Sequence, residues 1–168
     1  MIEIQNKINH IEANQKDQAK QMLEIKRLVN SLNIKTAFIN LSNEGFLCYY
    51  IIFNLDKVCL NSTEIKHFEE YNKIPNVKII NHPYLKVMIR KYDLIHISLN
   101  PLFEDLTSYI GRIESCANKC IVTSHTTNNE NDSKVIEEYL TSRGWEISYL
   151  DKQYYGINIY KKLKQWKN

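Results

Sequence analysis

Hydrophobic and polar positions change their spacing at about residue 34. Residues 2–33 include no Gly or Pro, and a seam of apolar and amide side chains recurs there at alternating steps of four and three residues. The seam consists of Ile4, Ile8, Ile11, Gln15, Gln18, Met22, Ile25, Val29 and Leu32. This heptad spacing predicts one long helix over residues 1–33, with a polar middle.

The two halves of this predicted helix suit different neighbours. Residues 22–32 are apolar enough to dock on a folded domain, whereas the first half contains Asn9, Asn14 and Gln15, which make a poor core. We expect the second half to pack on the domain and the first half to form a coiled-coil contact with a second copy, giving a homodimer. The alternative is an amphipathic lead-in that frays.

Beyond residue 34, short apolar runs alternate with stretches of helical spacing. The predicted strands are 36–41, 57–60, 77–80, 92–97, 119–123, 145–150 and 156–160. Helices are expected over 45–53, from Asn61 to about 73, from the Asn100 region to Cys116, and over 133–143 with Gly144 as C-terminal cap. The inner strands lack clean alternation, which is typical of a parallel sheet buried on both faces. The last two alternate and lie close together, so they should pair antiparallel.

Composition changes this picture little. A chain of 168 residues suits one domain, here 34–162, with the helix before it and a basic tail, 163–168, after it. The net charge of +3 allows a nucleic-acid partner without requiring one. No apolar run approaches about 18 residues and no signal-type segment opens the chain, so we expect a cytoplasmic protein without a membrane contact.

The cysteines do not form a metal-binding pattern. Cys48, Cys59, Cys116 and Cys120 have no framework-like spacing, and most lie in apolar segments, which predicts buried free thiols. Cys116 and Cys120 lack a second pair or paired histidines, so we expect no metal site.

The order of the predicted strands and helices is similar to that of a known protein family. Five alternating β-α units followed by a close strand pair resemble the class I S-adenosylmethionine-dependent methyltransferases over about residues 34–162. The segments that carry the resemblance are 92–97, Gly144-Trp145 and 155–160. It implies an α/β, Rossmann-like three-layer sandwich, with a mostly parallel seven-stranded sheet and an antiparallel final strand. It also implies S-adenosylmethionine as cofactor, bound outside the carboxyl ends of the strands.

The resemblance places the cofactor residues at three strand ends. In the family a glycine-rich loop follows the first strand, and an acidic residue that accepts hydrogen bonds from the ribose ends the second. Here Leu41 stands where the first glycine is expected, and Asn61 is in the acidic residue's neighbourhood. The implied cofactor-binding residues are Asn40, Ser42, Gly45, Asn61 and Ser98. The alternatives are a strand-helix turn capped by Ser42 or Asn43, and a helix capped by Asn61.

A third segment concerns the methyl acceptor. Asn100-Pro101-Leu102-Phe103 is similar to the Asn-Pro-Pro-aromatic motif of methyltransferases that act on exocyclic or amide nitrogens, although Leu102 departs from it. The resemblance implies that Asn100 and Pro101 hold the amino group and that Phe103 stacks on it, which makes them the catalytic residues. The alternative is a helix start with Asn100 as N-cap.

Two histidines lie near the same strand ends. His125 follows the fifth predicted strand and is a candidate for contact with substrate. His96 lies within the fourth strand, where we expect a satisfied core histidine or a helix-facing one.

Two functions from different classes remain open. The first is methyl transfer to a nitrogen or hydroxyl of a small molecule or a nucleic acid. The second is a catalytically inactive scaffold that acts through self-association or partner binding. Leu41 and Asn61 favour the scaffold, whereas the strand order, Gly45 and Asn100-Pro101 favour the enzyme. A nucleotide-binding module lacks a phosphate-cradling glycine pattern and ranks last.

Overall fold

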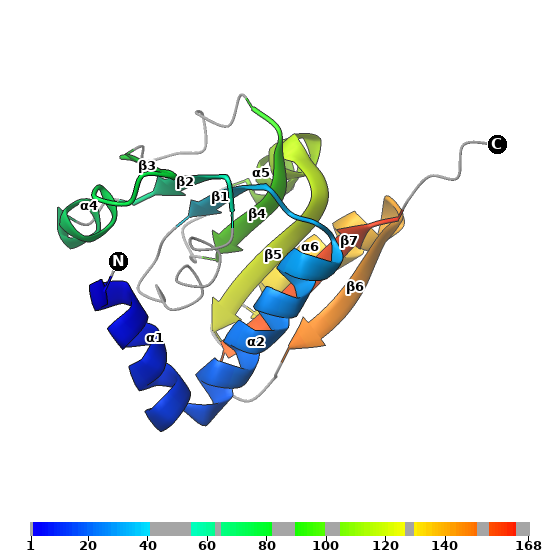
Figure 1. Cartoon of the computed structure of the whole chain (residues 1–168). Helices are drawn as coiled ribbons and strands as arrows, with labels where there is room; N and C mark the ends of the chain where they lie inside the picture. The colour runs from blue at the N-terminus through cyan, green and yellow to red at the C-terminus, as the bar shows by residue number, and fades with distance from the viewer. Residues whose placement is uncertain are drawn as a thin grey trace. The chain divides into compact units, whose positions relative to one another are not determined.

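A computed structural model describes residues 2–40, 55–62, 65–81, 90–99, 105–126, 130–150 and 155–163. The chain divides into two compact units, Met1–Pro83 and Tyr84–Asn168 (Figure 1). The predicted helix over 45–53 lies outside the described residues. Among the helices that are described, none combines the length and the hydropathy that crossing a bilayer requires.

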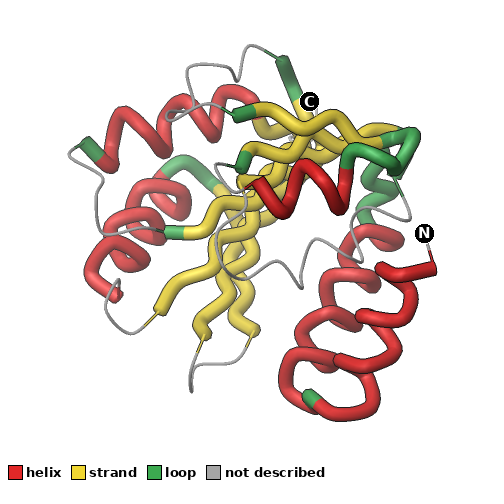
Figure 2. The backbone as a smooth tube through the Cα atoms, turned by 90° about the vertical axis from the view of Figure 1, so that its left-hand side faces the viewer, coloured by secondary structure: helices red, strands yellow, loops and turns green. Residues whose placement is uncertain are grey.

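The first unit begins with two helices, so the prediction of one long helix is wrong. α1 spans Ile2–Asn14 and α2 spans Lys16–Ser31. Gln15 between them has φ −131° and ψ 72°, outside the helical region. Figure 2 shows this break as a short loop between the two N-terminal helices. Two local causes favour it: the side-chain amide of Asn14 donates to the carbonyl of His10 at 3.1 Å, and the polar middle of the seam contributes little burial.

Three parallel strands follow in the first unit. β1 spans Thr36–Asn40, β2 spans Lys57–Asn61 and β3 spans Val77–Ile80, in the order β3-β2-β1. All three predicted strands are confirmed to within one residue. The central side chains of β1 and β2 are buried, as the parallel pattern predicts, whereas Lys78 of β3 is exposed and its other residues are half-buried. The short helix α4, Ile65–Tyr71, precedes β3, and its Glu70 accepts an ion pair from Lys7 of α1 at 2.7 Å.

The described residues of the second unit form four further strands and two helices. These are β4 (Tyr92–Ser98), α5 (Leu106–Cys116), β5 (Ala117–Thr126), α6 (Glu130–Ser142), β6 (Trp145–Leu150) and β7 (Tyr155–Lys162). β4 and β5 are parallel, and β7 runs antiparallel to both β5 and β6, between which it lies. The predicted antiparallel final strand is therefore confirmed. Within this unit the strand order is β4-β5-β7-β6.

Helix ends in the second unit differ partly from the predictions. The carboxylate of Asp105 accepts a hydrogen bond from the backbone N–H of Ser108 at 3.0 Å and caps α5. Asn100, the predicted N-cap, lies outside the described residues. α6 begins at Glu130, three residues earlier than predicted, because acidic residues in its first turn interact favourably with the helix dipole. Gly144, with φ 82°, ends α6 as predicted.

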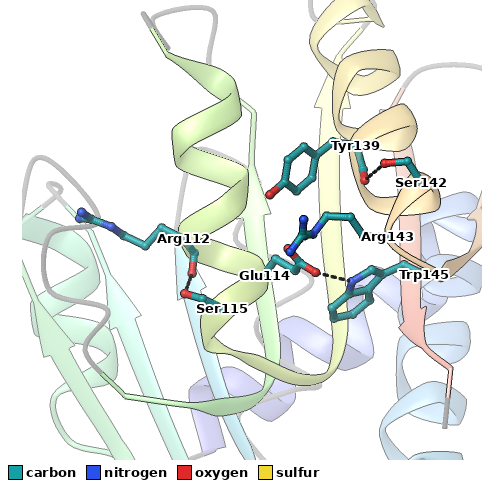
Figure 3. A network of polar contacts seen from close by, with 7 residues as sticks. All are labelled: Arg112, Glu114, Ser115, Tyr139, Ser142, Arg143 and Trp145. Atoms are coloured by element: carbon teal, nitrogen blue, oxygen red, sulfur yellow. Dashed lines mark hydrogen bonds and ion pairs between the residues drawn. The ribbon is translucent and has the colours of Figure 1, made fainter. Parts of the chain in front are cut away.

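One carboxylate joins three elements of this unit (Figure 3). Glu114 of α5 accepts hydrogen bonds from Nε of Arg143 at 2.5 Å and from Nε1 of Trp145 at 3.2 Å. The guanidinium of Arg143 also lies over the ring of Tyr139, 5.4 Å from its centre. This Glu114 cluster ties α5 to the end of α6 and to the first residue of β6.

Candidate functional site

The carboxyl ends of β1 and β2 carry a pair of amides. Asn40 and Asn61 are the last residues of their strands and are register partners, so their side chains lie on the same face of the sheet. Nδ2 of Asn61 donates a hydrogen bond to Oδ1 of Asn40 at 3.3 Å. Asn61 is buried and Asn40 is half-buried. Two of the predicted cofactor residues are therefore brought together.

This geometry overturns the capping reading of Asn61. Asn61 pairs with Asn40 on one side and with Ile80 on the other as part of β2, and Ser62, which follows it, is not helical. The amide pair carries no net charge, and it offers both donors and acceptors where parallel strands end. Such a pair can hydrogen-bond neutral hydroxyl groups, but without the charge assistance that a carboxylate provides.

A second group of polar residues lies at the carboxyl ends of β4 and β5. Ser98 is the last residue of β4 and is the register partner of Ser124 in β5. The backbone N–H of Leu99 donates to the carbonyl of Ser124 at 2.8 Å, which extends the pairing by one residue. Ser98 and Ser124 are both buried. The predicted site residue Ser98 therefore lies at a strand end, as the resemblance requires.

His96 is buried as expected, but it is not satisfied. Only 3% of the residue is exposed, and neither ring nitrogen has a hydrogen-bond partner in the described part of the chain. Burial lowers the pKa of His96 to about 4, because the charged ring would lose its hydration. The ring is therefore neutral at physiological pH. The prediction of a satisfied core histidine is wrong in this respect.

The other predicted residues are placed less completely. His125 was expected just beyond its strand, but β5 continues to Thr126 and pairs His125 with Gly156 of β7. Ser42, Gly45, Asn100, Pro101 and Phe103 lie outside the described residues, so their roles stay predictions.

The thiols are structural. Cys59, Cys116 and Cys120 are buried thiols that form no disulfide, which confirms the prediction for these three, whereas Cys48 lies outside the described residues. Burial raises the pKa of Cys120 to about 12, so its thiol stays protonated. Within the ranges that the structure describes, no three His, Cys, Asp or Glu side chains are grouped as a metal site would need.

The sequence analysis missed a buried hydrogen-bond network under α6. Asn158 of β7 donates to the hydroxyl of Ser133 at 2.9 Å and to that of Tyr160 at 3.3 Å. All three residues are buried. The signal was available, since Asn158 is a polar residue between two isoleucines in an alternating strand. This network fixes β7 to α6 and has no feature of a binding site.

Comparison with solved structures agrees with the strand order. A methyltransferase from Geobacter sulfurreducens superposes with a TM-score of 0.67 at 10% identity, over 96% of this chain and 88% of that one. An N-methyltransferase from Bradyrhizobium japonicum gives 0.66 at 9% identity, over 89% and 98%. The chain has the class I methyltransferase fold. A proposed O-methyltransferase from Klebsiella pneumoniae has the same fold, with a TM-score of 0.67 at 10% identity over 95% and 89%.

The methyltransferase fold is shown by structure alone. No protein-family model matches the sequence, and no curated protein matches it either. At such low identities a shared fold does not carry over substrate or activity. Function must therefore be argued from the side chains at the strand ends.

Proposed function

We propose that this protein is an S-adenosylmethionine-dependent methyltransferase of the cell interior. The observation that supports this most is the Asn40–Asn61 pair at the carboxyl ends of adjacent parallel strands. In open α/β sheets, ligands bind at these ends. A neutral pair with donors and acceptors fits the vicinal hydroxyls of a ribose, which also donate and accept.

The proposed roles follow the strand ends. Asn61 and Asn40 would hydrogen-bond the ribose of the cofactor, which supplies an activated methyl group when bound. Ser42, Gly45 and Ser98 would complete the contacts to it.

The acceptor would be held by a different set of residues. Asn100 and Pro101 would hold a nitrogen or hydroxyl acceptor, Phe103 would stack on it, and His125 would contact it from the next strand. Alignment of nucleophile and methyl group supplies much of the rate in such reactions, so this assignment needs no general base.

Calorimetric titration with S-adenosylhomocysteine tests the proposal. We expect measurable heat with the wild-type chain and weaker binding with Asn61→Ala. Asn76→Ala is the matched control, because Asn76 is an amide of the same unit that precedes β3 instead of ending a strand, where it donates to the carbonyl of Leu55 at 2.7 Å. No heat at near-millimolar ligand would overturn the proposal. The other candidate, an inactive scaffold, is not favoured over methyl transfer by the structural likenesses.

We also propose that α1 mediates a homodimer. Its seam residues Ile4 and Ile11 follow the heptad spacing that is typical of a coiled-coil contact. Sedimentation of the full chain should give twice the 19.9 kDa mass of one chain. Ile11→Asp should lower it to one chain, whereas Asn9→Asp, at an exposed position of the same helix, should not. A wild-type monomer would exclude the dimer.

A further inference from the structure

Three polar side chains share one face of the second unit's sheet. Side chains alternate along β4, so His96 and Ser98 point to the same side, with Cα atoms about 7 Å apart. Ser124 is the register partner of Ser98 and therefore lies on that face too. His96 and Ser124 are diagonal neighbours, about 7–8 Å apart, a separation that one bridging group can span.

Two of these side chains are buried without partners. In the described part of the chain, neither the ring nitrogens of His96 nor Oγ of Ser124 has a hydrogen-bond partner, and Ser124 is only 1% exposed. An unpaired buried polar group costs about 1–3 kcal/mol, so this arrangement is unfavourable for folding alone. The Asn158 network on the same sheet shows that this unit can pair its buried polar groups.

We propose that His96, Ser98 and Ser124 form a hydrogen-bonding subsite for an uncharged hydroxyl or amide group. Within the proposed function, this group belongs to the methyl acceptor. The subsite lies beside the end of β4, where Ser98 is the most exposed of the three residues. A bound group that donates to one member and accepts from another offsets the cost of their burial.

The chemistry of the three residues selects against charged ligands. A neutral imidazole carries one donor and one acceptor, and each serine hydroxyl can do both. Burial keeps the ring neutral, since it lowers the pKa of His96 to about 4. A carboxylate or an ammonium group would bring a charge to a buried position where none of the three members carries a compensating charge, which is costly. A hydroxyl or an amide avoids that cost.

Nitrogen NMR of the full chain with 15N-labelled histidine tests this subsite without the cofactor. The probes are phenol and acetamide, with acetate and methylammonium as charged counterparts. We expect phenol, acetamide or both to shift the ring-nitrogen signals of His96, and the charged probes to leave them unchanged. His96→Phe assigns those signals by their loss. Ser124→Ala should weaken the response about fivefold to tenfold, the equivalent of one hydrogen bond.

Thr123→Val provides the matched control. Thr123 is also buried and its hydroxyl lacks a partner in the described ranges, but it lies on the opposite face of β5. Its substitution should leave the response intact. The subsite is refuted if no probe shifts His96, if the charged probes act equally, or if Thr123→Val weakens the response as much as Ser124→Ala. Because S-adenosylhomocysteine is absent, the result is independent of the calorimetric test of the cofactor.

Discussion

Replacing Asn61 with aspartate should strengthen the binding of S-adenosylhomocysteine. In the proposed cofactor site, Asn61 would take the place of the carboxylate that accepts hydrogen bonds from the ribose in class I methyltransferases. Its amide now donates to Oδ1 of Asn40 at 3.3 Å, a long hydrogen bond whose loss costs little. Rotation of the Asn40 amide would present an NH2 group to the new carboxylate, so the pair can be kept with reversed polarity.

The size of the effect follows from two opposing contributions. Hydrogen bonds to charged groups contribute about 1.5–3 kcal/mol, compared with about 0.5–1.5 kcal/mol for neutral ones. Burial of a carboxylate at a position that is 7% exposed removes part of this gain. For two ribose hydroxyls the difference sums to about 2–3 kcal/mol, so a net gain of about 1–2 kcal/mol remains after the burial cost, which corresponds to about fivefold to thirtyfold tighter binding.

Isothermal calorimetry of Asn61→Asp beside the wild type measures this gain. Asn76→Asp is the matched control, because it makes the same chemical change before β3, where Asn76 hydrogen-bonds the carbonyl of Leu55. It should destabilise the chain without tightening binding. The gain of Asn61→Asp should shrink as the pH falls towards about 4, where an ordinary aspartate becomes protonated.

Two results would contradict the reasoning. If Asn61→Asp binds no more tightly than the wild type at neutral pH, the amide pair does not contact the ribose. If Asn76→Asp gives the same gain, the effect comes from net charge and not from a hydrogen bond at the strand end.

The remaining predictions concern stability. Glu114→Ala should lower the free energy of unfolding by about 2 kcal/mol, because it leaves the buried indole N–H of Trp145 unpaired. Denaturant titration measures this loss. It should be smaller for Glu114→Gln and almost absent for Glu138→Ala, which changes an exposed residue. Wild-type stability should fall by about 3 kcal/mol between pH 6.5 and pH 4, since the unfolded ring of His96 takes up a proton there and the folded ring does not. His96→Phe should remove this part of the pH dependence, and an unchanged profile would refute it. Asn158→Leu should unfold at lower denaturant than the wild type, because two buried hydroxyls lose their donor; equal midpoints would contradict this.

Much of the fold could be predicted because it depends on local patterns. β2 is centred on the apolar run 58–60, β3 is three apolar residues around Lys78, and β6 and β7 alternate, so these local patterns identify the strands without tertiary information. Gly144 is equally local, because a positive φ favours glycine. The break at Gln15 was missed because the heptad seam continues through it, although its polar residues contribute little burial.

The candidate site was only partly predictable. Asn40 and Asn61 were proposed from their places at strand ends, but their contact depends on the register of β1 with β2. The pairing of Ser98 with Ser124 likewise follows from strand register, which no single segment specifies.

By itself, the sequence determined the alternation of strands and helices and the reversed final strand, because hydrophobic spacing and turn residues act over a few positions. Tertiary structure alone decided which polar groups meet and which are left without partners. Whether His96 is satisfied depends on the side chains that other strands bring to it, and these lie far away along the chain.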